Sequence, residues 1–166
     1  ELKPLVGRGR RERIYFDAVT DASFLLIDES YNANPASMKA AIQTLGQCEN
    51  KENGRKIAVL SDRGELGGQA GQLHCDLAPT LQEAGIEQLF VTGEHVKRMA
   101  DVVFSDYSEI KVNYFNDKKA LERALLHNIR SGDVIMIKGS NSGGMSTIVS
   151  SLLKLDLNQE KQAVNS

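Results

Sequence analysis

The chain has 166 residues, 41% of them hydrophobic, which is enough to bury one core but falls below the size at which chains usually divide into several domains. Its 20 lysines and arginines nearly balance 22 aspartates and glutamates, and the net charge of -2 excludes a global attraction to nucleic acid or anionic lipid. No apolar run approaches the roughly 20 residues that span a bilayer, and the two cysteines lack the spacing of a metal site or a disulfide framework. We therefore expect one cytoplasmic domain whose partners are small molecules or proteins.

The first half of the chain alternates strand and helix signals. Residues 14–19 predict an edge strand, and the apolar run at 24–27 predicts a buried strand. Asn34 is a good N-cap residue and Pro35 suits the first helical position, so a helix is expected to start here, followed by apolar residues at helical spacing. A second buried strand is expected at 57–60.

The second half of the chain repeats this alternation. Residues 69–84 predict a helix that Pro79 should break or kink. Further strands are expected at 88–92, 112–115 and 134–137. Helices are expected after the last two of these strands, one starting at Asn116-Asp117 and one covering 145–153.

Alternation of this kind predicts the fold class and the organisation of the chain. The expected fold is α/β, with a doubly wound, mainly parallel sheet, helices on both faces and right-handed crossovers. The polar ends predict a linker at 1–13 and a tail at 157–166, on either side of one folded domain at 14–156. Because the chain starts at Glu1 and not at a methionine, we expect it to be a piece of a longer protein.

Polar loops follow the predicted strands at the positions where such folds bind ligands. Ligands bind outside the carboxyl ends of the strands, and four of the loops there are polar or rich in glycine: 28–35, 61–67, 92–95 and 138–144. They supply four carboxylates and a lysine, namely Asp28, Glu29, Asp62, Glu65 and Lys138. We expect Gly93 to join Asp28, Asp62 and Lys138 on one edge of the sheet, in a site for a polar, phosphate-bearing or zwitterionic ligand.

Each of these residues also has a purely structural interpretation. Asp28 and Asp62 belong to a residue type that caps helices, and a single lysine such as Lys138 is more often solvated than bound to a ligand. Glycines before the last helix supply a turn as readily as an anion site. The sequence has neither a G-x-x-x-x-G-K-[ST] loop nor a G-x-G-x-x-G run after the first strand, so it predicts no complete triphosphate or dinucleotide site.

A long signature follows the first buried strand. Residues 25–38 read LLIDESYNANPASM, which closely resembles the D-D-S-Y-N-A-N-P-x-S-M signature of the Mur ligases that add D-alanyl-D-alanine to a cell-wall precursor. Further matches stand in the expected order: Gly7-Arg8-Gly9, Ile57 to Asp62 with Glu65-Leu66-Gly67 and His74, and Lys138-Gly139-Ser140. The chain departs from the pattern at Glu29, where the signature has aspartate, and at Ser61-Asp62-Arg63, where Gly-Asp-Met is usual.

The resemblance implies a Rossmann-like C-terminal domain of a three-domain, ATP-dependent ligase. A central ATPase domain before it would carry the phosphate loop and most of the contacts to ATP and Mg²⁺. The family reaction uses ATP to phosphorylate the carboxylate of UDP-N-acetylmuramoyl-tripeptide, and the amine of D-alanyl-D-alanine then attacks the acyl phosphate. The resemblance therefore implies a cytoplasmic enzyme, which we expect to be a monomer with no nucleic-acid or membrane partner and inactive when only this domain is present.

The same resemblance implies roles for individual residues. Arg8 would reach the ATP phosphates and take part in catalysis, because a guanidinium is always charged and binds two oxygens at once. Glu29 would also be catalytic, and with Asp28 and Tyr31 it would contact the nucleotide. The substrates would be bound by the remaining matching residues, which are Asn32, Asn34, Asp62, Glu65, Lys138 and Ser140.

Two other functions stay open from the sequence alone. Acids, a hydroxyl and a lysine at successive strand ends mimic the phosphoacceptor site of bacterial receiver domains, and the residues are Asp28, Glu29, Asp62, Thr92 and Lys138. Receivers hold two helices and a strand between the acid pair and the acceptor, whereas the interval from Asp28 to Asp62 predicts one helix. The second alternative is a non-catalytic nucleotide-binding module.

Overall fold

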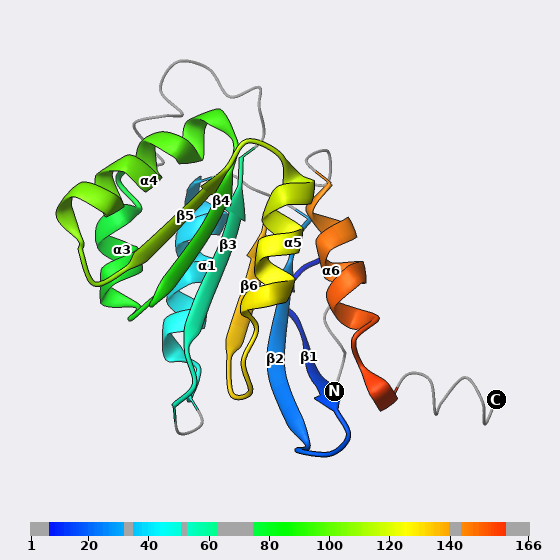
Figure 1. Cartoon of the computed structure of the whole chain (residues 1–166). Coiled ribbons are helices and arrows are strands. Elements are labelled where there is room, and N and C mark those ends of the chain that lie inside the picture. The colour runs from blue at the N-terminus through cyan, green and yellow to red at the C-terminus, as the bar shows by residue number, and fades with distance from the viewer. Residues whose placement is uncertain (1–6, 32–34, 51–52, 63–74, 140–143, 159–166) are drawn as a thin grey trace.

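A six-stranded sheet forms the centre of the computed structural model, which describes residues 7–31, 35–50, 53–62, 75–139 and 144–158 (Figure 1). In the order β1-β2-β6-β3-β4-β5, the strands are Arg10–Asp17, Ala22–Glu29, Val134–Lys138, Lys56–Ser61, Gln88–Thr92 and Lys111–Phe115. β1 runs antiparallel to β2, and the other pairs of neighbours are parallel. The predicted α/β fold with a mainly parallel sheet is confirmed.

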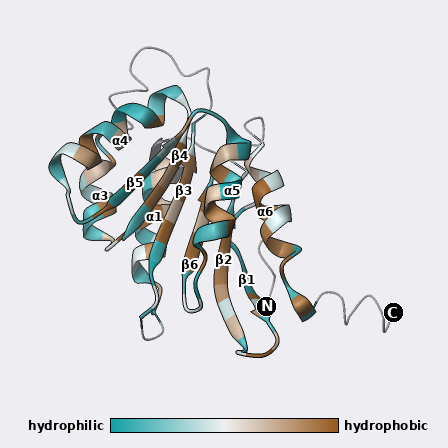
Figure 2. Ribbon diagram, in the orientation of Figure 1, coloured by the Kyte–Doolittle hydropathy of each residue, from teal (hydrophilic) through white to brown (hydrophobic). Residues whose placement is uncertain are grey.

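Helices cover both faces of this sheet, as a doubly wound fold requires (Figure 1). One face carries α1 (Pro35–Gln47), α3 (Ala78–Glu83) and α4 (Glu94–Asp106), and the other carries α5 (Lys118–Asn128) and α6 (Met145–Leu153). The apolar sides of the helices are turned toward the sheet (Figure 2). Two buried clusters result, one containing Ile42, Leu81 and Val103, and the other containing Phe24 and Ile148.

The edge strand β1 differs from its predicted bounds. It begins at Arg10, before the expected start at residue 14, and it ends at Asp17 and not at residue 19. The prediction was wrong because it relied on apolar residues, whereas an edge strand carries charged side chains such as those of Arg11 and Arg13, which discourage pairing with another chain. The division of the chain into a linker, a domain and a tail stays a prediction.

The positions of the helices agree in part with those predicted from the sequence. α1 begins at Pro35 as expected, and Asp117 caps α5 by accepting a hydrogen bond from the backbone N–H of Ala120 at 2.8 Å. The break expected near Pro79 is observed: Cys75 is helical, residues 76–77 form a turn, and α3 begins at Ala78 with Pro79 in its first turn, where the missing N–H costs nothing. Residues 69–74 of the expected helix lie outside the described residues. The expected elements omitted α4. No helix in the described ranges is long and apolar enough to cross a membrane.

A buried ion pair joins the amino ends of β3 and β6. Asp133 is fully buried, and its carboxylate accepts hydrogen bonds from Arg55 Nε at 3.0 Å, Arg55 Nη2 at 2.7 Å and the N–H of Arg130 at 2.8 Å. Arg55 also donates to the side-chain and backbone oxygens of Asn128 at 2.9 and 2.6 Å. The N–H of Val134 donates to the Arg55 carbonyl at 2.8 Å, so this network fixes the register of the two strands at the edge opposite the predicted site.

Candidate functional site

The register of the parallel strands places the predicted residues on one edge. Glu29 is the partner of Lys138 across β2 and β6, and Lys138 is also the partner of Leu60 across β6 and β3. Ser61 is in turn the partner of Thr92 across β3 and β4. Because Asp28, Asp62 and Gly93 directly adjoin these strand ends, the expected cluster at the carboxyl edge is confirmed.

Glu29 and Lys138 form a loose, partly buried pair of opposite charges. The Lys138 Nζ lies 3.9 Å from Glu29 Oε2, and the two side chains are 3% and 22% exposed. Burial raises the pKa of the Glu29 carboxyl, and the nearby ammonium opposes that shift. Burial likewise lowers the pKa of Lys138, and Glu29 opposes it. At this separation neither group is held by a direct hydrogen bond to the other.

Residues 7–9, named here the glycine strap, lie along the end of β2. Gly7 donates its N–H to Asp28 Oδ2 at 2.9 Å and accepts from the N–H of Tyr31 at 3.1 Å, while Gly9 donates to the Asp28 carbonyl at 2.8 Å. Gly7 and Gly9 have φ values of +80° and +85°, and a β-carbon on Gly7 would lie 3.1 Å from the Tyr31 β-carbon. Glycine is therefore required for the strap to follow β2 this closely.

Arg8 projects from the strap over the ring of Tyr31. Its guanidinium carbon lies 4.1 Å from the ring centroid, within the range of a cation–π contact. Arg8 is exposed, and Tyr31 is 49% exposed, so a large aromatic side chain and a permanent cation face solvent together beside Glu29. The Arg8 side chain is therefore held against the Tyr31 ring, and its two neighbours in the chain, Gly7 and Gly9, are hydrogen-bonded to residues at the end of β2.

The two aspartates left open between capping and ligand binding both bind backbone amides. Asp62 Oδ2 accepts hydrogen bonds from the N–H groups of His95 at 2.6 Å and Val96 at 3.0 Å, so it caps α4 from the neighbouring strand. Asp28 accepts from Gly7 and from the N–H and hydroxyl of Ser30, at 2.9, 3.1 and 2.6 Å. The helix-capping interpretation is therefore confirmed for Asp62, whereas Asp28 binds Gly7 and Ser30, which lie outside the helices. The contacts of both aspartates to ligand stay predictions.

The α4 cap depends on a glycine. Gly93 has φ +118°, and a β-carbon there would lie 2.6 Å from Asp62 Oδ2. The absence of a side chain lets the carboxylate reach the first turn of α4. The spacing in the sequence gave no sign that Asp62 would cap a helix that starts after the next strand.

Some predicted residues cannot be placed, and one loop was overlooked. Asn32, Asn34, Glu65 and Ser140 lie outside the described residues. The prediction that ligands bind at the carboxyl ends of the strands named four loops, but β5 also ends at this edge, and the loop after it leads into Lys118. Applying the same rule to this fifth loop would have added Lys118 to the candidates.

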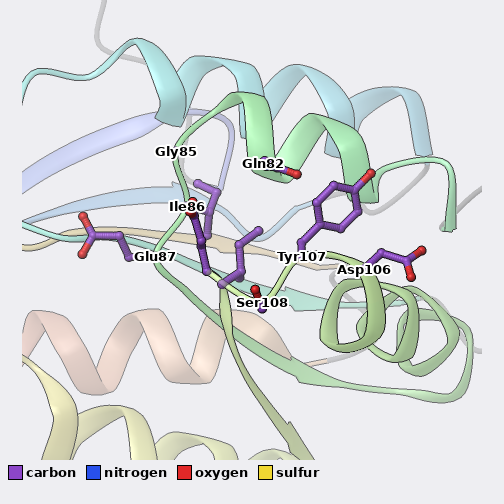
Figure 3. Close-up of a pocket in the computed structure, with 9 residues that line it drawn as sticks. Gln82, Gly85, Ile86, Glu87, Asp106, Tyr107 and Ser108 are labelled. Carbon is purple, nitrogen blue, oxygen red and sulfur yellow. The ribbon is translucent and has the colours of Figure 1, made fainter.

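A hollow of about 260 Å³ lies at the other edge of the sheet (Figure 3). It is lined by the segments that precede β4 and β5, including Ile86, Glu87 and Tyr107. These segments lie at the amino ends of the strands, so the hollow is separate from the cluster around Lys138.

The geometry disfavours the phosphoacceptor alternative. A receiver aspartate must present its carboxylate as a nucleophile, whereas Asp62 Oδ2 is held by the backbone amides of His95 and Val96. Within the described residues, a single helix, α1, separates β2 from β3, as predicted from the interval between the two aspartates.

Comparison with known proteins identifies the family. A model of the Mur ligase, glutamate ligase domain matches residues 10–141. The chain belongs to the Mur ligase family. This Mur ligase domain is 31% identical, over 83% of its length, to the UDP-N-acetylmuramoyl-tripeptide–D-alanyl-D-alanine ligase of Bacillus subtilis. It is 33% identical, over 77% of its length, to the Escherichia coli enzyme of the same name.

Solved structures agree with this assignment. MurF from Acinetobacter baumannii matches 93% of the domain with a TM-score of 0.70 and 27% identity. The domain covers 30% of the Bacillus subtilis relative, 26% of the Escherichia coli relative and 32% of the Acinetobacter chain. The resemblance to Mur ligases is confirmed, and it is confined to the C-terminal domain of these longer proteins.

Proposed function

We propose that the full-length protein joins D-alanyl-D-alanine to UDP-N-acetylmuramoyl-tripeptide and that this chain is its C-terminal domain. ATP would convert the tripeptide carboxylate to an acyl phosphate, which the dipeptide amine then attacks. The observation that carries the proposal is the match to MurF from Acinetobacter baumannii, with a TM-score of 0.70 over 93% of the chain. Relatives whose names describe this reaction, from Bacillus subtilis and Escherichia coli, support it.

In this proposal Arg8 binds phosphoryl oxygens of ATP. Its support is the stacking on Tyr31, 4.1 Å from the guanidinium carbon, and the anchoring of Gly7 and Gly9 on β2. A pre-positioned guanidinium loses little side-chain entropy on binding and forks onto two oxygens. Arg8 would therefore contribute charge where negative charge develops during phosphoryl transfer.

Glu29 and Lys138 would bind the neighbouring polar groups of the substrates. Glu29 would accept hydrogen bonds on the nucleotide side, next to Tyr31 and Asp28, and Lys138 would neutralise a substrate oxyanion. The separation of 3.9 Å means that neither group uses a hydrogen bond on the other, which supports these roles. Asn32, Asn34, Asp62, Glu65 and Ser140 stay proposed substrate contacts on the strength of the signature alone.

ATP fits the charges at this edge, since Arg8 and Lys138 supply cations for its phosphates. Among the described residues, no three acidic, histidine or cysteine side chains come together as a metal site. From the family resemblance alone, the proposal places the contacts to Mg²⁺ mainly on the implied central domain, where the metal would neutralise phosphate charge. The same proposal describes a cytoplasmic monomer.

The test is a coupled assay of the full-length protein with ATP, Mg²⁺, D-alanyl-D-alanine and UDP-N-acetylmuramoyl-tripeptide. ADP release and the mass of the pentapeptide product should rise together, and running tripeptides with different third residues identifies the preferred substrate. Arg11→Ala, which removes an exposed arginine of β1, serves as the matched control for Arg8→Ala. Absence of product with every tripeptide would reject the proposed reaction.

The chain alone is proposed to fold without catalysing this reaction. Its buried clusters on both sheet faces provide a complete core, whereas one face of an ATP cleft leaves most of the ligand in water. A cooperative urea transition combined with no ADP release is the expected result. Amide formation by the purified chain, after contaminants are excluded, would contradict it.

A further inference from the structure

The carboxylate of Asp28 joins the two backbone segments that carry the Arg8–Tyr31 contact. Its Oδ2 accepts a hydrogen bond from the N–H of Gly7 at 2.9 Å. Its Oδ1 accepts from the N–H of Ser30 at 3.1 Å and from the Ser30 hydroxyl at 2.6 Å. Gly7 directly precedes Arg8, and Ser30 directly precedes Tyr31. One side chain therefore holds the backbone next to the guanidinium and the backbone next to the ring beneath it.

The burial of Asp28 separates it from any ligand in solution. Asp28 and Ser30 are 4% and 3% exposed, whereas Arg8 is exposed and Tyr31 is 49% exposed. Both oxygens of the carboxylate are already bound by donors of the protein. A ligand that arrives from solvent can therefore contact the guanidinium and the ring, but not the carboxylate that joins their backbone segments.

The donors around this carboxylate require an acceptor at both of its oxygens. They are two backbone N–H groups and one hydroxyl, and an ionised carboxylate accepts from all three. The amide of an asparagine would instead turn its NH2 group toward the N–H of either Gly7 or Ser30. Asp28→Asn would therefore keep the shape of the side chain and release one of the two segments.

A direct bond between the two segments completes this frame. The N–H of Tyr31 donates to the Gly7 carbonyl at 3.1 Å. A β-carbon on Gly7 would lie 3.1 Å from the Tyr31 β-carbon and 3.4 Å from Ser30 Oγ, so the segments pack closely. Without the bond to Asp28, the Gly7 end of the strap would be held by Tyr31 alone. The guanidinium, at the end of a long side chain, would then lose its fixed place over the ring.

We propose that Asp28, together with Ser30, is a positioning residue of the ligase reaction that acts through Arg8. The inference rests on the proposed function, in which Arg8 binds phosphoryl oxygens of ATP. Catalysis of phosphoryl transfer depends on charge that is placed in advance, and a displacement of about 1 Å is enough to lower the rate substantially. This role differs from the direct nucleotide contact that the resemblance implies for Asp28.

The test is a double-mutant cycle in the full-length ligase, made of Asp28→Asn, Arg8→Ala and the two together. Asp28→Asn should lower kcat/KM for ATP about tenfold. The KM for D-alanyl-D-alanine should stay unchanged, because only the phosphoryl side of the site loses a correctly placed cation. In the Arg8→Ala enzyme, Asp28→Asn should lower kcat/KM by less than about twofold, because no guanidinium is left to position.

Asp133→Asn is the matched control, because it removes another buried carboxylate at the opposite edge of the sheet. Assayed well below its unfolding temperature, it should change kcat/KM by the same factor with and without Arg8. An undiminished effect of Asp28→Asn in the Arg8→Ala enzyme would overturn the proposal and indicate that Asp28 contacts the nucleotide directly. A rise in the KM for D-alanyl-D-alanine as large as the loss in kcat/KM would also overturn it, since that result indicates a general disruption of the site.

Ser30→Ala is a milder form of the same test. It removes the hydroxyl donor and leaves both backbone N–H groups bound to Asp28. The loss in kcat/KM should be about threefold or less, and it should again vanish in the Arg8→Ala enzyme. This variant carries the cycle if Asp28→Asn does not fold. A loss that persists without Arg8, or one larger than that of Asp28→Asn, would contradict a role through Arg8.

A measurement on the 166-residue chain separates this inference from the proposed reaction. The ring of Tyr31 should shift the side-chain proton NMR signals of Arg8 upfield, because the guanidinium lies 4.1 Å from the ring centroid. Asp28→Asn should return these signals toward those of an unstructured arginine, as Tyr31→Leu should, whereas Asp133→Asn should leave them in place. A full-length protein without ligase activity would reject the proposed function, but the signals would still report whether Asp28 holds Arg8. Unchanged Arg8 signals in Asp28→Asn would reject the positioning role.

Discussion

Replacing Asp133 with asparagine should strongly destabilise the domain while barely altering its shape. Asp133 is fully buried and the Arg55 side chain is 9% exposed, so solvent screening of this pair is small. Asparagine fills the same space but leaves the buried guanidinium without a counter-charge. Breaking a buried, hydrogen-bonded pair by removing one partner costs about 3 kcal/mol or more. For a domain of this size, that loss corresponds to a Tm lower by about 6–12 °C.

Urea unfolding followed by circular dichroism measures this loss, provided that the slope of the transition is unchanged. Asp106→Asn, an exposed carboxylate at the end of α4, is the control and should unfold at the urea concentration of the parent chain. The double replacement Arg55→Met with Asp133→Leu should recover much of the stability, because it leaves no unpaired charge. A loss below about 1 kcal/mol for Asp133→Asn, or a double mutant as unstable as the sum of its single changes, would refute the reasoning.

Three further predictions concern the carboxyl edge. In the full-length enzyme, Arg8→Ala should lower kcat/KM at least about tenfold, equivalent to about 1.4 kcal/mol. Tyr31→Ala, which removes only the ring under the guanidinium, should lower kcat/KM less. If Arg8→Ala has the same kinetics as Arg11→Ala, Arg8 does not belong to the site. Gly93→Ala should destabilise by about 1–3 kcal/mol, through strain at φ +118° and the clash with Asp62. Gly85→Ala, at φ +72° with no neighbour within 4 Å, reports strain alone, so equal losses in the two variants would exclude an effect of the clash. Because burial raises the pKa of Glu29 in the folded chain, its protonation favours folding. This contribution is fully present below the ordinary pKa of 4.5 and is lost as the pH rises through the folded pKa. The unfolding free energy of the parent chain relative to Glu29→Gln should therefore increase as the pH is lowered from 7 toward 4.5, and a flat difference in urea titrations would contradict the burial of Glu29.

The central sheet was predictable because its strands are buried on both faces. Segments such as 57–60 and 134–137 consist of consecutive apolar residues, and their order along the chain requires parallel crossovers. The clustering of Asp28, Asp62, Gly93 and Lys138 then followed from topology alone. β1 was misjudged because charge at an edge strand masks the alternation. α4 was overlooked, although buried Val96, Met99, Ala100 and Val103 have helical spacing.

What the sequence did not reveal is which polar groups are already bound by the backbone. The backbone N–H groups of His95 and Val96 that donate to Asp62 follow it in the chain only after α3 and β4, so only the tertiary structure shows that they meet. The proximity of Lys118 to Gly144 is of the same kind, because it arises where two helices begin side by side. Backbone geometry at glycine, rather than a spacing of charged residues, determines both contacts.

The glycine strap fixes the backbone of Arg8 relative to the sheet. Three hydrogen bonds of the Gly7 and Gly9 backbone fasten the strap to Asp28 and Tyr31, so the backbone of Arg8 cannot swing independently of β2. Any rotation about a point before Gly7 therefore carries the backbone of Arg8 and that of Glu29 together. In a ligase of the proposed kind, arrival of this cation at the phosphates would coincide with docking of the whole domain, which would make phosphoryl transfer dependent on the presence of the surface that receives the second substrate.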